Sequence, residues 1–449
     1  MRLLDAQTCE LKEFFSPLIP PYAILSHTWD EEEIILQDLA RPETITDKKG
    51  FQKIKKCCAQ ALIDGHDWVW VDTCCIDKTS SAELSEAINS MYRWYQEAEV
   101  CYAYIRDLPP QISENLDQEA FKSAKWFTRG WTLQELIAPK IVEFYDEGWN
   151  RVGTKSQLRN LIKEITGVKS RVLLGTKSPW SVSVAERLSW AATRSTSREE
   201  DIAYCLLGIL NINMPLLYGE GPRAFIRLQE EFLRTSEDLT LLLWTLEPNT
   251  TSDSDLEESG ILASSPDGFA KIKIIDSEGH HFAILNNCWD VVKLPQHYLS
   301  PLRHLRGPTW RAEEGHVPVP PAITPRGLHV ELVIIMLPGK EERYFAWTGR
   351  LFSQTGNPSI ANPRVGYLCI ELCRNGQAFR VNTGSLLFID SNQYVTYARL
   401  LPLYLATKSS SENRYDNDVS SAASIVTDRS ADGENSRFKL LRSSRTWAF

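Results

Sequence analysis

The chain has 449 residues, 43% of them hydrophobic and 24% charged, and a formal net charge of −9. This length suggests two to three structural units, and the acidic balance, with no cluster of lysines and arginines, argues against a nucleic-acid-binding protein. The first residues carry Asp5, Glu10 and Glu13 and lack the apolar segment of a secretory signal. No apolar run approaches the ~20 residues of a membrane-spanning helix. We therefore expect a cytoplasmic protein without a membrane span.

Short apolar runs alternate with helical periodicity in the first 150 residues. Buried strands are predicted at residues 22–26, 68–71, 100–105 and 141–145. A helix is predicted over residues 51–62 with a stop at Gly65, and another begins after Ser80, which forms a capping box with Glu83. Alternating strands and helices predict a parallel sheet covered on both faces by right-handed crossovers.

A tryptophan-rich stretch, residues 126–138, predicts a short helix that ends at Pro139. At helical spacing Trp131 and Glu135 share a face, so the carboxylate lies beside aromatic side chains that could stack on a flat ring. The alternative is that the aromatic residues belong to the core and Glu135 is an ordinary surface acid.

Polar residues follow the first two predicted strands. Ser26, His27 and Trp29 come after the first strand, and Asp72 follows the second. In open parallel sheets ligands bind beyond the carboxyl ends of the strands, so these side chains are candidates for a binding site. Alternatively, His27 is a structural histidine and Asp72 caps a turn.

Ten cysteines are present, without the paired C-x-x-C spacing of a zinc site. We expect reduced, mostly buried thiols and no metal centre. A nucleophilic Cys74 or Cys75 is an open alternative, but neither has a paired base nearby in the sequence. The chain also lacks the G-x-x-x-x-G-K-[ST] motif of a P-loop nucleotide triphosphatase.

The remaining sequence divides by composition. Residues 1–150 form the predicted α/β core, and residues 151–245 show the periodicity of helices, with Ser197 and Glu200 as a second capping box. Residues 246–260 are polar and acidic, as in a linker. Short alternating runs over residues 261–406 predict a β-rich C-terminal domain, and residues 407–449 have the composition of a disordered tail.

Four ordered blocks resemble the signature of the fungal heterokaryon incompatibility (HET) domain. They are Tyr22–Trp29, Trp70–Asp77, Phe127–Leu136 and Asp201–Gly208. The resemblance implies an effector of nonself recognition between fungal strains that promotes programmed cell death, with an unknown protein trigger and self-association on activation. Asp30 departs from the family, which usually has glycine there, and adds a charge to this loop.

The block Trp131–Leu136 is also similar to the Trp-Cys-x-x-Glu-Leu block of Toll/interleukin-1 receptor (TIR) domains. This resemblance implies a flavodoxin-like parallel sheet, Glu135 as the catalytic residue, and NAD as substrate with no separate cofactor. Thr132 stands where the TIR block has cysteine. The expected fold is therefore α/β: a TIR-like parallel sheet with a helical extension, then a β-rich domain and a disordered tail.

The chemistry of such a site is consistent with these residues. A carboxylate can stabilise the positive charge that develops on ribose as nicotinamide leaves. Trp131 or Trp29 could stack on the nicotinamide ring, and Ser26, His27 and Asp72 could position ribose or phosphate groups. Two alternatives remain: a non-enzymatic, self-associating signalling adaptor with the same fold, and a small-molecule enzyme of another reaction class.

Overall fold

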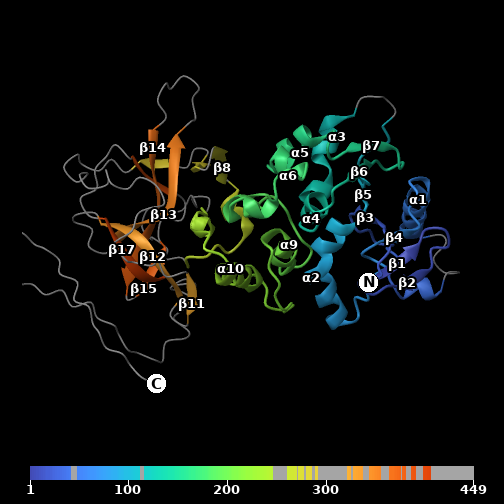
Figure 1. Cartoon of the computed structure of the whole chain (residues 1–449), viewed down its shortest axis with the longest axis horizontal. Coiled ribbons are helices and arrows are strands. Elements are labelled where there is room, and N and C mark those ends of the chain that lie inside the picture. The colour runs from blue at the N-terminus through green and yellow to red at the C-terminus, as the bar shows by residue number, and fades with distance from the viewer. Residues whose placement is uncertain are drawn as a thin grey trace, which may run out of the picture.

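A seven-stranded sheet forms the N-terminal part of the protein in the computed structural model (Figure 1). The structure describes residues 1–41, 48–111, 116–245 and 260–270, together with Pro321 and, between residues 272 and 405, the strands β8–β17. The strand order of the first sheet is β2-β1-β4-β3-β5-β6-β7. Its strands are β1 (Arg2–Asp5), β2 (Leu11–Glu13), β3 (Ala23–His27), β4 (Trp68–Trp70), β5 (Val100–Tyr104), β6 (Val142–Tyr145) and β7 (Arg151–Thr154).

The centre of this sheet is parallel. Strands β4, β3, β5 and β6 pair in parallel, whereas β1, β2 and β7 pair antiparallel at the two edges. In chain order the parallel strands therefore lie second, first, third, fourth, which is the order of flavodoxin-like sheets. The predicted α/β fold with a parallel sheet is confirmed. The edge strands were not predicted, because segments of three or four residues are too short to carry a clear apolar pattern.

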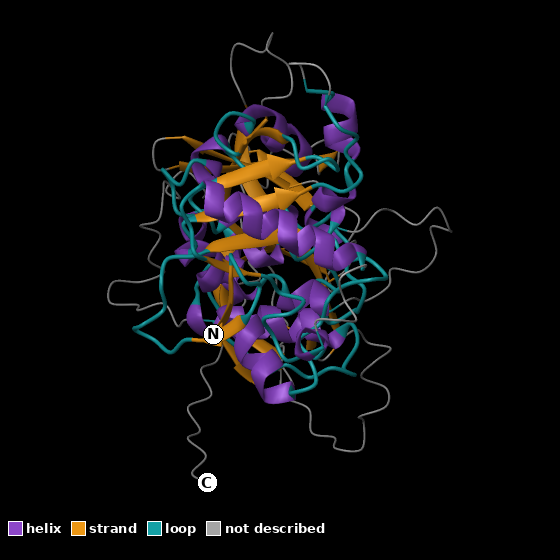
Figure 2. Ribbon diagram, turned by 90° about the vertical axis from the view of Figure 1, so that its right-hand side faces the viewer, coloured by secondary structure: helices purple, strands orange, loops and turns teal. Residues whose placement is uncertain are grey.

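Helices cover both faces of the sheet. They are α1 (Lys49–Ile63), α2 (Ser81–Glu97), α3 (Gln118–Ser123) and α4 (Thr132–Ile137), with the 3-10 helix η1 at Asp38–Ala40. Helices α1 and α2 lie on opposite faces, as expected when the chain moves one way along the sheet from β3 to β4 and the other way from β4 to β5, and α2 packs against α4. Figure 2 views the molecule from the side of the N-terminal sheet, with helices lying beside the strands.

The predicted ends of α1 and α2 are confirmed. Gly65 follows α1 with a φ of 84°, a conformation that glycine adopts at little cost. The Ser80 hydroxyl accepts a hydrogen bond from the Glu83 backbone N–H at 3.3 Å, as expected for a helix N-cap.

The predicted helix over residues 126–138 is wrong in one respect, because it is two pieces. Residues Lys125–Thr128 form a 3-10 helix, η3, and α4 begins only at Thr132. Between them the Gly130 N–H donates to the Ser195 carbonyl at 2.9 Å, and the Ser195 N–H donates to the Thr128 carbonyl at 2.8 Å. These backbone groups pair with a distant segment, so they cannot form helical hydrogen bonds.

The segment after β7 is helical, as predicted. It contains α5 (Arg159–Thr166), α6 (Ser170–Leu173), η4 (Pro179–Ser181), α7 (Val184–Ser189), α8 (Asp201–Tyr204), α9 (Leu207–Leu210), α10 (Arg223–Thr235) and η5 (Leu239–Leu242). The capping box predicted at Ser197 is wrong, because α8 starts at Asp201 without a side-chain cap. The Glu200 carboxylate instead accepts backbone hydrogen bonds from Gly219 at 2.7 Å and Gly221 at 3.1 Å.

Residues 260–270 pack on this helical segment and include η6 (Pro266–Phe269). The Trp244 indole donates to the Ile261 carbonyl at 2.9 Å, and the Gln229 amide exchanges two hydrogen bonds with the Ala263 backbone. One cluster of buried apolar side chains extends from the sheet through these helices.

The C-terminal part is β-rich, as predicted. Its strands are β8 (Ile272–Ser277), β9 (His280–Leu285), β10 (Trp289–Val291), β11 (Ala322–Thr324), β12 (Gly327–Met336), β13 (Arg343–Gln354), β14 (Arg364–Asn375), β15 (Gln377–Arg380), β16 (Leu386–Asp390) and β17 (Ala398–Leu405). The pairings of β14, β15, β17, β12 and β13 return to β14, so this part of the sheet closes on itself. The predicted tail, residues 407–449, and residues 246–259 of the predicted linker lie outside the described residues.

Among the described residues, no helix combines the length and the apolar character that a membrane crossing requires.

Candidate active site at the end of strand β3

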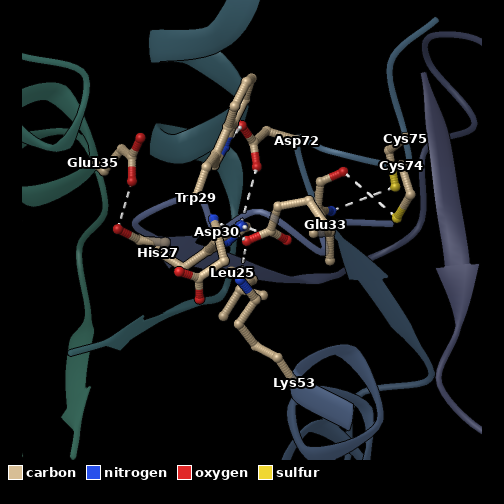
Figure 3. Close-up of polar contacts among 12 residues, drawn as sticks. Leu25, His27, Trp29, Asp30, Glu33, Lys53, Asp72, Cys74, Cys75 and Glu135 are labelled. Atoms are coloured by element: carbon tan, nitrogen blue, oxygen red, sulfur yellow. Dashed lines mark hydrogen bonds and ion pairs between the residues drawn. The ribbon is translucent and has the colours of Figure 1, made fainter. Parts of the chain in front are cut away.

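Two neighbouring residues at the end of β3 face opposite sides of the sheet. Ser26 is fully buried and contacts Glu135 of α4, whereas the buried His27 side chain lies near Glu33 and near Asp72, which follows β4. Successive side chains of a strand alternate between faces, which separates the two residues. Figure 3 shows Glu135 and Lys53 approaching the end of the strand from different directions. The candidate site therefore consists of two clusters joined at the strand end.

On the α4 face, a chain of hydrogen bonds ends at Glu135. The Trp126 indole N–H donates to the Ser26 hydroxyl at 2.9 Å, and that hydroxyl donates to Glu135 Oε2 at 2.5 Å. Because Ser26 accepts from the indole, its single hydrogen is available to the carboxyl group. Glu135 itself is only 7% exposed.

Burial raises the pKa of Glu135 to about 8. Hydrogen bonds from Ser26 and Tyr95 and the charge of Arg194 act in the opposite direction, and the negative charge of Asp72 adds to the effect of burial. The carboxyl group is therefore mainly protonated at pH 7 and ionises just above it. Such a group can donate a hydrogen bond in one form and stabilise positive charge in the other.

On the α1 face, His27 lies between two carboxylates. His27 Nε2 is 3.5 Å from Glu33 Oε2 and 3.9 Å from Asp72 Oδ1, and Lys53 Nζ lies 2.5 Å from Glu33 Oε1. Burial acts to raise the pKa of Glu33, but His27 and Lys53 outweigh it and lower that pKa. Neither imidazole nitrogen has a hydrogen-bond partner among the described residues.

Asp72 connects the two clusters to an exposed indole. It accepts a hydrogen bond from Trp29 Nε1 at 2.8 Å, lies near His27 and raises the pKa of Glu135. The Trp29 side chain is 56% exposed, and Lys78 Nζ lies 3.5 Å from the centre of its ring. A planar ligand could replace the ammonium group on this ring.

The structure does not bring Trp131 into this group. Trp131 is half-buried and precedes α4, and its hydrogen bond to Asp201 of α8 opposes the burial that raises the pKa of Asp201. The other predicted site residues lie in the two clusters and the Trp29–Asp72 contact that joins them.

The loops after β3 and β5 meet where the strand order reverses. Asp30 forms an ion pair with Arg106, which follows β5, and the Asp30 N–H donates to Glu33 Oε1 at 2.8 Å. In sheets of this order, the switch point between the first and third parallel strands is where ligands bind. Glu135 and the Asp30–Arg106 pair both adjoin that position.

Comparison with known proteins identifies the first part of the chain. Residues 22–114 match the family model described as heterokaryon incompatibility protein (HET).

This part of the chain is similar to a HET domain.

"Vegetative incompatibility protein HET-E-1" from Podospora anserina is 47% identical over 244 residues, which cover 51% of this chain and 18% of the relative. The chain therefore spans less than a fifth of that relative's length. No solved structure matches the chain.

The HET domain match includes part of the site. Ser26, His27, Trp29 and Asp72 lie within it, whereas Glu135 follows it in the sequence. The HET domain as matched therefore contributes the ends of β3 and β4, and the later part of the α/β core contributes the carboxyl group.

Several contacting residues were not singled out from the sequence. Trp126 lies in the tryptophan-rich stretch and Tyr95 in the helix predicted after Ser80, and the single polar atom of each side chain does not alter the hydrophobic periodicity. Glu33 and Lys53 lie in ordinary charged stretches, and no sequence signal pairs them with His27.

Proposed function

We propose that this protein is an effector of heterokaryon incompatibility that promotes programmed cell death, and that it does so by TIR-like hydrolysis of NAD at Glu135 in the cytoplasm. The HET domain supports the first part of the proposal, as does 47% identity to a relative named for vegetative incompatibility. One observation carries the second part: a buried carboxyl group, with a pKa raised to about 8, adjoins the switch point of a flavodoxin-order sheet.

The reaction requires little covalent chemistry from the protein. The bond between nicotinamide and ribose C1′ breaks, its electron pair leaves with nicotinamide, and positive charge develops on the ribose. Ionised Glu135 would stabilise that charge, as the carboxylates of glycosidases do. Water then adds to C1′ and releases a proton, giving ADP-ribose and nicotinamide.

The neighbouring residues have roles that follow from their contacts. Ser26 would hold one carboxyl oxygen of Glu135 and favour its ionised form. Asp72 and His27 would position ribose hydroxyl or phosphate groups, and the exposed Trp29 ring would stack on a base.

The burial of Glu135 makes this a latent enzyme. A carboxyl group that is 7% exposed must become accessible before NAD can reach it. We therefore propose that self-association or a protein trigger opens the site, in keeping with the role of a death effector that must stay silent until recognition.

The second candidate is a non-enzymatic adaptor that signals by self-association. The same burial favours it, since a structural carboxyl group is also buried and hydrogen-bonded, as Glu135 is.

A hydrolysis assay with the purified full-length chain tests the proposal. Nicotinamide and ADP-ribose are measured by chromatography over a range of protein concentrations, so that self-association can occur. We expect Glu135→Gln to lower turnover at least about 100-fold, because one electrostatic stabiliser of the transition state is lost. Glu186→Gln is the matched control, since Glu186 is also buried but pairs with Lys169 at 2.9 Å, outside the site.

The thermal stability of each variant is measured in the same preparation. Equal turnover by the wild type and a folded Glu135→Gln variant would contradict the role of Glu135. Wild-type protein that kills cells but shows no turnover at any concentration would favour the adaptor.

A further inference from the structure

The segment that follows α7 forms hydrogen bonds with the start of α4 and with the residues before it. Arg194 Nη1 donates to the Arg129 carbonyl at 2.8 Å and to the Thr132 hydroxyl at 3.0 Å. The backbone of Ser195 adds the two hydrogen bonds that interrupt the helix, described above. Thr132 is the first residue of α4, and Glu135 lies one turn further on. A helical segment outside the sheet thus fixes the element that carries the carboxyl group.

Arg194 is buried, which is unusual for an arginine. It is 6% exposed, its Nε donates to the Trp190 carbonyl at 3.2 Å, and its Nη2 has no hydrogen-bond partner in the described part of the chain. Burial lowers the pKa of Arg194 to about 10, so the guanidinium remains charged at neutral pH. A buried cation destabilises the fold unless a partner compensates it, and the Glu135 carboxylate is within electrostatic reach.

We infer that Arg194 is a positioning residue of the Glu135 site: it holds the first turn of α4 through Thr132 and places a positive charge near the carboxyl group. The inference rests on the proposed function and deepens it, since it makes the helical segment part of the same site. Arg194 acts on Glu135 without contacting substrate. The HET domain match ends at residue 114 and does not include it.

The physical consequence concerns the ionisation of Glu135. Burial disfavours the charged carboxylate, and the charge of Arg194 favours it. Removing that charge should therefore raise the pKa of Glu135 further above its usual value and leave less carboxylate at neutral pH.

Infrared titration of the full-length protein tests this directly. The carbonyl band of protonated Glu135 is the band that disappears in Glu135→Gln, and its pH midpoint is read in each background. Arg194→Gln removes the charge. Arg194→Met removes it with an apolar side chain of similar length, which is better tolerated in a buried position where the glutamine variant fails to fold. Arg194→Lys retains the charge.

Arg187→Gln is the matched control. Arg187 is a second buried arginine, 4% exposed, whose Nη1 donates to the Ile209 carbonyl at 3.0 Å. Burial lowers its pKa to about 10 as well, but its charge interacts with Asp238 and not with Glu135. The two substitutions therefore remove the same group from equally buried positions.

We expect the midpoint to rise in Arg194→Gln or Arg194→Met and to stay near the wild-type value in Arg194→Lys and Arg187→Gln. An unchanged midpoint in a folded, uncharged Arg194 variant overturns the inference, and so does an equal rise in Arg187→Gln. The titration measures the ionisation of Glu135 in the absence of NAD. Its result therefore tests the role of Arg194 even if the protein does not hydrolyse NAD. Where hydrolysis is found, its pH profile should move with the infrared midpoint, and faster turnover in Arg194→Gln would contradict a positioning role.

Discussion

The pKa of a glutamate shifts in opposite directions on the two faces of β3. On the α4 face, Glu135 meets neutral hydrogen-bond donors, chiefly Ser26, and burial raises its pKa to about 8. On the α1 face, Glu33 lies against Lys53 and His27, which outweigh burial and lower its pKa. The two carboxyl groups contact adjacent residues of β3: Glu135 contacts Ser26, and Glu33 lies near His27. The difference indicates that the charged groups beside a carboxyl group, and not its burial alone, determine the direction in which its pKa shifts.

The sharpest contrast between the two faces is the pH dependence of stability. The folded pKa of Glu135 lies above the value of 4.5 for a free glutamate, so its contribution falls as pH rises from 4.5 to 8. In the wild type this effect should lower the free energy of unfolding by up to about 5 kcal/mol over this range, and Glu135→Gln should lack that decrease. Glu33→Gln should act with the opposite sign, since the contribution of Glu33 is present above pH 4.5 and is lost as pH falls through its lower folded pKa.

Urea unfolding of both variants from pH 3 to pH 9, a range that extends below 4.5, measures these contributions. Parallel profiles for Glu135→Gln and Glu33→Gln would show that the two faces do not differ in this respect.

Breaking the ion pair between Lys53 and Glu33 on the α1 face should also lower the free energy of unfolding. Lys53→Met leaves Glu33 buried without its closest cation, and such losses destabilise proteins by about 3–5 kcal/mol. Lys48→Met is the control, since Lys48 forms a partly exposed pair with Asp38 whose loss should cost about 0–1 kcal/mol. Thermal unfolding compares the two, and equal losses would mean that the buried pair has no special role.

Ser26→Ala tests the α4 face with a smaller effect. It leaves the buried Trp126 N–H without an acceptor and removes a donor to Glu135, which should cost about 1–3 kcal/mol. The pKa of Glu135 should also rise, because Ser26 favours the ionised form. A variant as stable as the wild type, with an unchanged infrared midpoint, would exclude the hydrogen-bond chain.

The same rule applies to the thiols, where the effect is on reactivity alone. A hydrogen bond from Cys58 lowers the pKa of the half-buried Cys9 to about 7, whereas burial raises the pKa of Cys57. Among the seven cysteines whose side chains are described, we expect Cys9 to be alkylated first at pH 7.5, and more slowly in Cys58→Ala. Mass spectrometry after brief iodoacetamide treatment gives the order, and earlier labelling of Cys57 would reverse it.

Much of the fold follows from local pattern. The runs at β3 and β5 and the cap at Ser80 are determined by residues close in sequence, and they were predicted within a residue or two. The convergence of Ser26 and Asp72 at one sheet edge also follows, because parallel strands end together.

The site required information that is not local. The interruption before α4 depends on Ser195, and the Arg194–Arg129 contact spans 65 residues. The separation of Ser26 from His27 could have been predicted from the period of two along a strand, yet the sequence placed both in one group. Two cations that act against burial, Lys53 at Glu33 and Arg194 at Glu135, come from helical segments with no sequence link to the strand.

The most direct test of the central claim is a time course in a fungal or yeast host that expresses the full-length chain from an inducible promoter. Cellular NAD and viability are followed for the wild type, Glu135→Gln and Glu186→Gln at matched protein levels. We predict that NAD falls before viability in the wild type and in Glu186→Gln, and that both stay constant in Glu135→Gln. Death with NAD unchanged, or NAD loss that persists in Glu135→Gln, would contradict hydrolysis at Glu135.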